Sequence, residues 1–123
     1  MSLRAKRINL MIKLPPPQLK GKVSVEEAIA KRRSVRRYRS ESLTLSQLSQ
    51  LLWSAQGITG AGKLRAAPSA GATDPLEIFV FIGKQTVIVT LNEVKGKQPQ
   101  EELQAGIYHY EVDSHSLSLH KQG

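Results

Sequence analysis

The sequence predicts an α+β fold in which helices pack on a mainly antiparallel sheet. Its first half holds two segments that begin with helix-capping signatures, and its second half holds short apolar runs rich in β-branched residues. Helices that precede strands, rather than alternating with them, are typical of an α+β arrangement. The length of 123 residues fits a single small domain with one core.

Residues 1–22 are basic and end near Leu14–Pro17, a proline run that cannot be helical and is stiff and extended. We therefore expect a basic, proline-containing arm over residues 1–22, followed by one domain over residues 23–123.

The first helix is predicted from Ser24, whose hydroxyl can cap the segment while Glu27 reaches back from three residues on. It runs through Ile29 to about Arg33, where the arginine cluster Arg32–Arg37 ends it. The second helix starts with the equivalent pair Thr44 and Gln47 and closes at Gly57. Its expected buried face is Leu45, Leu48, Leu51, Leu52 and Ala55, which recur at helical spacing.

Segments 57–62 and 63–74 are predicted as a glycine-rich connection and a loop. Leu76–Ile82 is an almost continuous apolar run between Pro75 and Gly83, which predicts a buried strand. Thr86–Leu91 is a second strand candidate, and Asn92–Gln104 is polar and either loop-like or weakly helical. Ile107–Glu111 and Leu117–His120 form a predicted hairpin around residues 113–114.

Composition limits the possible functions. The chain has no cysteine, which excludes disulfides and thiolate chemistry and is compatible with a reducing compartment, so we expect a cytoplasmic protein. No apolar run approaches the roughly 18 residues needed to span a bilayer, so no membrane partner is expected. Twelve of the eighteen lysines and arginines lie in residues 1–39. A basic nucleic-acid-binding domain is therefore one alternative, although the aromatic residues are too scattered for a base-stacking surface.

Two further motifs favour ordinary structural roles. Gly57–Lys63 matches the start of a phosphate-binding P-loop, but Leu64 stands where a Ser or Thr is needed and the segment follows a helix instead of a strand. His109, His115 and His120 match no compact metal-ligand spacing, and we expect them to be solvated strand residues. No catalytic side-chain constellation and no metal site are predicted.

The run Arg32–Arg37 is the most informative stretch. Arginine matches phosphate oxygens with a planar fork of donors, and a serine hydroxyl can add one hydrogen bond. If the helix ends here and the chain extends, Arg32, Ser34 and Arg36 project to one face and can converge on one phosphate. The alternative is a solvated helix end whose cations complement the helix dipole.

The order of several segments resembles the front half of the nitroreductase-like flavoproteins, and within them the branch of SagB-type dehydrogenases, which oxidise thiazoline and oxazoline rings in peptides. The segments that carry this resemblance are Leu14–Pro17, Val25–Tyr38, Leu45–Gly57, Ala67–Gly71, Pro75–Glu77 and Gly106–Tyr110. Together they cover most of residues 14–123.

The resemblance implies a nitroreductase-like fold and an FMN-dependent oxidoreductase. In such proteins the Arg-x-Ser-x-Arg segment holds the FMN phosphate, which implies Arg32, Ser34 and Arg36 as ligands, with Arg33 adjacent. The loop Pro68, Ser69, Ala70 and Gly71 would supply backbone contacts beside the isoalloxazine ring. FMN would carry hydride between NAD(P)H and a small electrophile such as a nitro compound or quinone, or oxidise a ring substrate as SagB-type enzymes do. The family implies a homodimer with FMN at the interface.

The chain departs from the family in two respects. Family members run to roughly twice this length, as expected of larger flavoenzyme domains. We therefore expect a fragment or a natural short form that lacks a late basic phosphate ligand and part of the dimer surface. Thr73-Asp74 also replaces the apolar residue and tyrosine that the SagB-type branch usually has before Pro75, which affects the expected substrate contacts. The missing half leaves a flavin-binding module without turnover as a further alternative.

Overall fold

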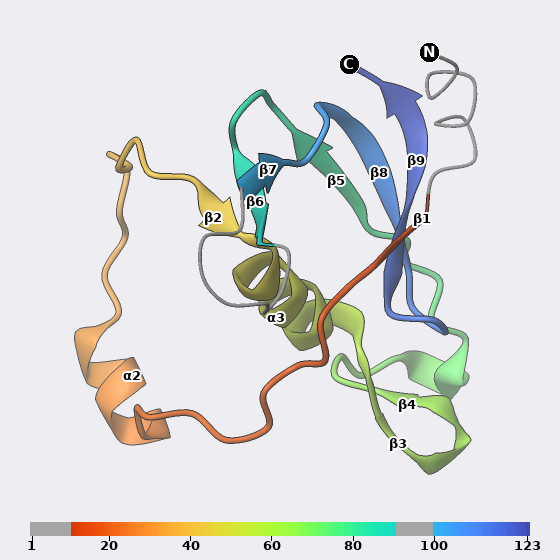
Figure 1. Ribbon diagram of the computed structural model, residues 1–123. Coiled ribbons are helices and arrows are strands. Elements are labelled where there is room, and N and C mark those ends of the chain that lie inside the picture. Colours follow the sequence, from red (N-terminus) through yellow and green to blue (C-terminus); the bar gives the residue numbers. More distant parts are fainter. Residues whose placement is uncertain (1–10, 91–99) are drawn as a thin grey trace.

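The structure is a computed structural model that describes residues 11–90 and 100–123 (Figure 1). Its main sheet has four strands in the order β1-β9-β8-β5, with every pair antiparallel. The strands are β1 (Met11–Lys13), β5 (Phe79–Ile82), β8 (Gly106–Glu111) and β9 (Ser116–Gln122). The expected α+β class and the predominance of antiparallel pairing are confirmed.

The hairpin β8–β9 forms the centre of the core. Side chains of β8 alternate between buried and half-buried, as period-2 geometry requires. Tyr108 and Tyr110 on β8 and Leu117 on β9 are almost fully buried, and the register pairs Tyr110 with Leu117. These residues anchor the sheet against the helical layer.

The first described residues of the predicted arm are part of this sheet. Residues 11–17 are extended, as the prolines predict, but β1 pairs with β9 and Leu14 is only 1% exposed. The Leu14 amide donates to the His115 carbonyl at 3.1 Å. Residues 1–10 lie outside the described residues.

A smaller sheet joins β2 (Leu43–Thr44), β6 (Val87–Thr90) and β7 (Gln100–Glu102). The pair β2–β6 is parallel and β6–β7 is antiparallel. Strand β7 corrects the expectation of a loop or weak helix for the end of segment 92–104, while residues 92–99 lie outside the described residues.

Helix α3 (Leu45–Gln56) packs beside β2 and β6. The predicted capping box is present, with Thr44 and Gln47 bonding reciprocally, and Gly57 is the C-cap. The buried face consists of Leu45, Leu48, Ser49, Leu52 and Gln56. Leu51 and Ala55 were expected on that face but are exposed. The core contacts the side of the helix that carries Leu45, Leu48 and Leu52, and Leu51 and Ala55 lie beside that face.

Helix α2 (Val25–Lys31) begins at the predicted Ser24 cap and ends with Arg32 as its C-cap. It buries none of its residues and lies at one side of the molecule, away from the main sheet (Figure 1). The expectation that both helices pack on the sheet is therefore met by α3 alone.

Two other segments differ from expectation. Strand β5 was predicted to be buried, but Phe79 and Phe81 on its outer face are exposed because no described element covers that side of the sheet. Segment 58–65 folds as a short β3 (Ile58–Gly60), a 3₁₀ turn (Ala61–Lys63) and β4 (Leu64–Arg65). No helix follows its glycines, in agreement with the rejection of a P-loop.

None of the described helices is long and apolar enough to cross a bilayer.

Candidate functional site

The predicted phosphate ligands follow α2 directly. The Arg32 amide closes the helix by donating to the Ala28 carbonyl at 3.0 Å, and the backbone of Arg32 is extended (φ −62°, ψ 129°). Arg33 donates from Nη1 to the carbonyls of Ala30 and Arg32, at 3.1 and 2.7 Å. Within the part of the chain that is described, the side chains of Arg32, Ser34 and Arg36 have no hydrogen-bond or ion-pair partner and are exposed. The segment thus presents two guanidinium groups and one hydroxyl that are available to an anion.

The loop Pro68–Gly71 presents small side chains around a tight turn. Gly71 (φ 66°) and Ala72 (φ 55°) lie in the left-handed region, and the Ser69 hydroxyl accepts the Asp74 amide at 2.7 Å. A Cβ added at Gly71 would meet only Thr73 Cγ2, at 4.0 Å, so the backbone there is open to close approach. This loop forms one wall of a pocket of about 270 Å³ that also includes Gln56 and Leu76.

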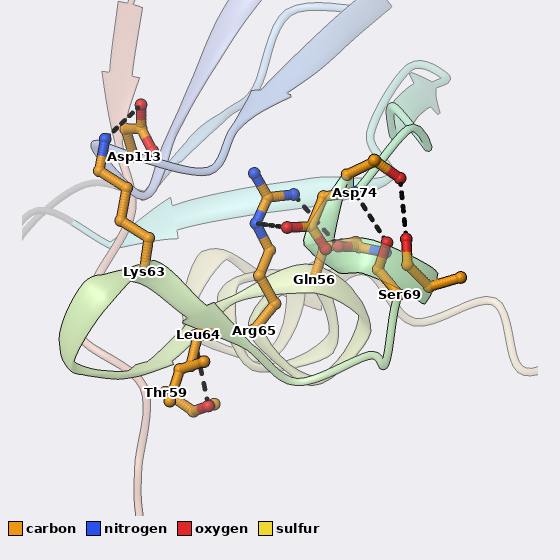
Figure 2. A network of polar contacts seen from close by, with 10 residues as sticks. Gln56, Thr59, Lys63, Leu64, Arg65, Ser69, Asp74 and Asp113 are labelled. Atoms are coloured by element: carbon orange, nitrogen blue, oxygen red, sulfur yellow. Dashed lines mark hydrogen bonds and ion pairs between the residues drawn. The ribbon is translucent and has the colours of Figure 1, made fainter.

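Arg65 ties the two ends of this loop to helix α3 (Figure 2). Its Nη1 donates to Gln56 Oε1 at 3.2 Å, and its Nε lies 3.9 Å from Asp74 Oδ2. Sequence reasoning missed Arg65 and Gln56 as members of this network. A glutamine on the apolar face of a helix was the available signal, because a buried amide needs a polar partner.

The structure does not bring the two predicted halves of the site together within one chain. Figure 1 shows the segment after α2 on one side of α3 and the Pro68–Gly71 loop on the other. No described pocket is lined by both sets.

A polar cluster lies on β8 beside a pocket of about 220 Å³. His109 contacts Glu77 through Nε2 at 2.6 Å and Glu111 through Nδ1 at 2.8 Å, while Ser118 donates to Glu111 at 2.6 Å. The hydrogen bond to Glu111, helped by that to Glu77, raises the pKa of His109 against the opposing effect of burial. The same bond lowers the pKa of Glu111. His109 is therefore held between carboxylates, which corrects the expectation of a merely solvated histidine. The i,i+2 spacing of His109 and Glu111 on a strand was the signal for this contact.

His115 is also not a solvated strand residue. Its Nδ1 contacts the Tyr110 hydroxyl at 2.7 Å, and its Nε2 lies 2.7 Å from Ser49 Oγ and 3.1 Å from the Pro15 carbonyl. Because the carbonyl can only accept, Nε2 carries the proton and Nδ1 accepts from Tyr110. Burial lowers the pKa of His115, with Lys13 adding to the effect. The network links the proline segment, α3 and the hairpin.

Among the described residues no group of three or more His, Cys, Asp or Glu side chains could hold a metal ion.

Comparison with known proteins shows the family. The model of the nitroreductase family matches residues 29–122. "Putative nitroreductase MJ1384" of Methanocaldococcus jannaschii is 38% identical over 95 residues, which is 77% of this chain and 40% of that protein. The crystal structure of a "putative nitroreductase" from Ralstonia eutropha JMP134 superposes with a TM-score of 0.70 and 26% identity, over 91% of this chain and 44% of that one. The chain thus spans less than half the length of these relatives. It belongs to the nitroreductase family and has a nitroreductase-like fold over the part that it covers.

Proposed function

We propose that this chain is part of an FMN-dependent oxidoreductase that moves hydride between NAD(P)H and a small electrophile such as a nitro compound or a quinone. Membership of the nitroreductase family supports an oxidoreductase, since the family typically binds flavin. One observation carries the assignment of the phosphate site. Arg32 ends α2 in extended backbone, Ser34 and Arg36 follow it directly, and the three side chains have no protein partner among the described residues.

These residues fit the phosphate of FMN. A dianionic phosphate is held best by charge-assisted donors, and two arginines with a hydroxyl provide them on one short segment. Arg33 has a different role, because its guanidinium already donates to the carbonyls that end α2. Arg32 and Arg36 are therefore the principal ligands in this proposal, with Ser34 as the third and Arg33 as support for the helix end.

The loop Pro68–Gly71 fits the edge of the isoalloxazine ring. Its small residues and the open space at Gly71 allow a flat ring to approach the backbone. FMN supplies the hydride chemistry when bound, and the protein binds and orients it. In this account Arg65 and Asp74 hold the loop ends and thereby set the position of the ring.

The site is completed by a second copy of the chain. Because α3 separates the arginine segment from the loop in one chain, we assign the phosphate ligands to one copy and the ring-contacting loop to its partner. Val25 and Ile29 lie one turn apart on α2, and each is 71% exposed. They form an apolar strip that a partner chain can cover.

A mixing experiment tests this arrangement. One variant carries Arg32→Ala and Arg36→Ala, and the other carries Gly71→Val, which obstructs the open backbone of the loop. Each variant alone is expected to lose FMN. A mixed dimer should regain about one FMN for every two chains, because one of its two sites combines an intact arginine segment with an intact loop. If both parts came from the same chain, mixing would restore nothing.

A second candidate function is flavin binding without turnover of a substrate. It is considered because this chain covers only 40% of one relative and 44% of another. Oxidation of NADPH and of NADH is followed with a nitroaromatic or a quinone as acceptor. Turnover supports the oxidoreductase, while FMN retention without turnover supports the binding module. A thiazoline-containing peptide as substrate tests the SagB-type reaction.

A further inference from the structure

Arg65 carries hydrogen-bond donors that the described part of the protein does not use. Its Nε is fully buried and has no hydrogen-bond acceptor, because Asp74 Oδ2 at 3.9 Å is too far for a hydrogen bond. Nη1 is satisfied by Gln56. Nη2 has no acceptor among the described residues and points away from both Gln56 and Asp74 (Figure 2). The side chain is only 19% exposed, so water compensates these donors poorly.

The guanidinium lines the pocket of about 220 Å³ beside β8. Pockets for drug-sized ligands are larger, about 300–1,000 Å³. The pocket is therefore suited to a small molecule. The unused Nη2 donor beside such a pocket favours a ligand oxygen, and a carboxylate gives the strongest match because its charge assists the hydrogen bond.

Negatively charged side chains line the same pocket as Arg65. Glu77 and Glu111 flank His109, which when protonated balances one of the two carboxylates, and Asp113 pairs with Lys63 at 3.5 Å. One negative charge remains on the pair Glu77 and Glu111. A plain anion would be attracted by Arg65 but repelled by this pair, whereas a cation alone would leave the donors of Arg65 unused.

We propose that this pocket binds a small zwitterion of the α-amino-acid class. The ligand carboxylate accepts hydrogen bonds from Arg65, and its ammonium group lies against Glu77 and Glu111. The ring of Phe79, whose centroid is 4.9 Å from that of His109, helps to hold the imidazole in place at the acidic end. Arg65 also holds the end of the Pro68–Gly71 loop, so the titrations with and without FMN are needed to separate amino-acid binding from the flavin assignment.

Calorimetric titration of the full chain tests the proposal, with FMN present and with FMN absent. The probes are glycine, L-alanine and L-serine, together with N-acetyl-L-alanine, which lacks the ammonium charge, and L-alaninamide, which lacks the carboxylate. At least one of the three amino acids should bind with a Kd below about 10 mM. L-Alanine should bind about tenfold more tightly than either blocked analogue. Absence of binding by all three amino acids, or equal binding of L-alanine and both analogues, would overturn the proposal.

Two variants locate the site. Arg65→Gln should weaken amino-acid binding about tenfold or more, and Glu77→Gln should reduce L-alanine to the affinity of its N-acetyl analogue. Arg39→Gln is the matched control, since Arg39 is exposed and, among the residues that the structure describes, pairs with Glu41 alone. Glu77 is 63% exposed, so its variant should fold even if Arg65→Gln does not. Unchanged affinity in folded Glu77→Gln protein would refute the assignment of the acidic end.

Discussion

Four arginines illustrate how surroundings assign different roles to one residue type. Arg33 donates to the last carbonyls of α2 and so belongs to the helix. Arg65 is half-buried between Gln56 and Asp74 and belongs to the loop network. Arg32 and Arg36 have no partner among the described residues, which leaves them free for a ligand.

Arg32, Ser34 and Arg36 together form the proposed phosphate clamp, and substitutions in it have a predictable effect. Each charge-assisted hydrogen bond contributes about 1.5–3 kcal/mol, so Arg32→Ala with Arg36→Ala should weaken FMN binding by at least about 100-fold. Fluorescence quenching during FMN titration measures this. Arg39→Ala, which removes a neighbouring charge outside the clamp, should change the Kd severalfold at most. Equal losses in both variants would mean that general positive charge, rather than a defined clamp, attracts the phosphate.

A second prediction at this scale concerns His115. Burial and the charge of Lys13 lower its pKa in the folded protein, while the Pro15 carbonyl partly opposes this. The neutral ring contributes stability that is complete above the unfolded pKa of about 6.5, and that contribution is lost as the pH falls through the folded pKa. Urea unfolding should therefore show that wild type exceeds His115→Gln in stability by an amount that shrinks below about pH 6.5.

Gln122→Ala, a substitution without a titratable group at the exposed end of β9, is the control for that experiment and should differ from wild type by an amount that does not vary with pH. The titration of His109 also affects stability, but it does so in wild type and in the variants alike, so its contribution cancels when their free energies of unfolding are compared. The pKa of His109 is raised, so its stabilisation is present below about pH 6.5 and is lost as the pH rises through its folded value. A difference between wild type and His115→Gln that does not vary with pH would contradict the proposed network.

The sequence predicted residues whose role is local and missed those whose role depends on distant partners. The caps Ser24 and Thr44 were identified because their partners lie three residues away. Arg65 and His115 were missed because their partners lie beyond the spacing of a helix turn or of neighbouring strand residues; Gln56 is nine positions from Arg65. The contact of His115 with Pro15, for example, joins residues one hundred positions apart.

At the scale of elements, the end of α3 is tightly constrained. Gly57 is the C-cap, and a Cβ there would lie 2.3 Å from Trp53 Cδ1 and 2.7 Å from the Trp53 carbonyl oxygen. The indole can move, but the helical carbonyl cannot move without disturbing the hydrogen bond from the Gly57 amide.

Gly57→Ala should therefore destabilise the protein by about 1–3 kcal/mol through steric overlap. Urea unfolding followed by circular dichroism measures this. Gly21→Ala is a matched control, because a Cβ at Gly21 meets no atom within 4 Å. If the two alanine variants were equally stable, the close packing of Trp53 over the helix end would be wrong.

Elements with strong local signals were predicted well, and the faces that they bury were predicted less well. Both helices, strand β6 and the β8–β9 hairpin lie near their expected positions. The exposure of Leu51, Phe79 and Phe81 could not be read from their apolar character, because burial depends on which other elements pack against them.

At the scale of the whole molecule, several apolar side chains of the described residues are exposed, and two groups of them matter here. One is the strip formed by Val25 and Ile29 on α2, and the other is the outer face of β5 at Phe79 and Phe81. Exposed apolar side chains grouped in this way are typical of surfaces that another chain covers. The sequence predicted the family and the fold class, but it could not place α2 relative to the sheet, since that helix buries nothing in its own chain.

The proposed dimer makes a prediction for this surface. Val25→Asp with Ile29→Asp should convert the protein to monomers in sedimentation-velocity experiments and should reduce FMN occupancy at the same time. The circular dichroism spectrum should change little, because neither residue is buried within the chain. Lys84→Asp, an exposed substitution outside α2, should remain dimeric. Monomeric wild-type protein that binds FMN fully would contradict the two-chain site.

Binding of FMN by this chain, as proposed, is decided by the flavin content of the purified protein. The purified protein is saturated with FMN, passed through a desalting column and denatured, and the released flavin is identified and counted by mass spectrometry and absorbance. The account predicts yellow protein that releases close to one FMN per chain, and no FAD. Colourless protein that retains no flavin after saturation would contradict it.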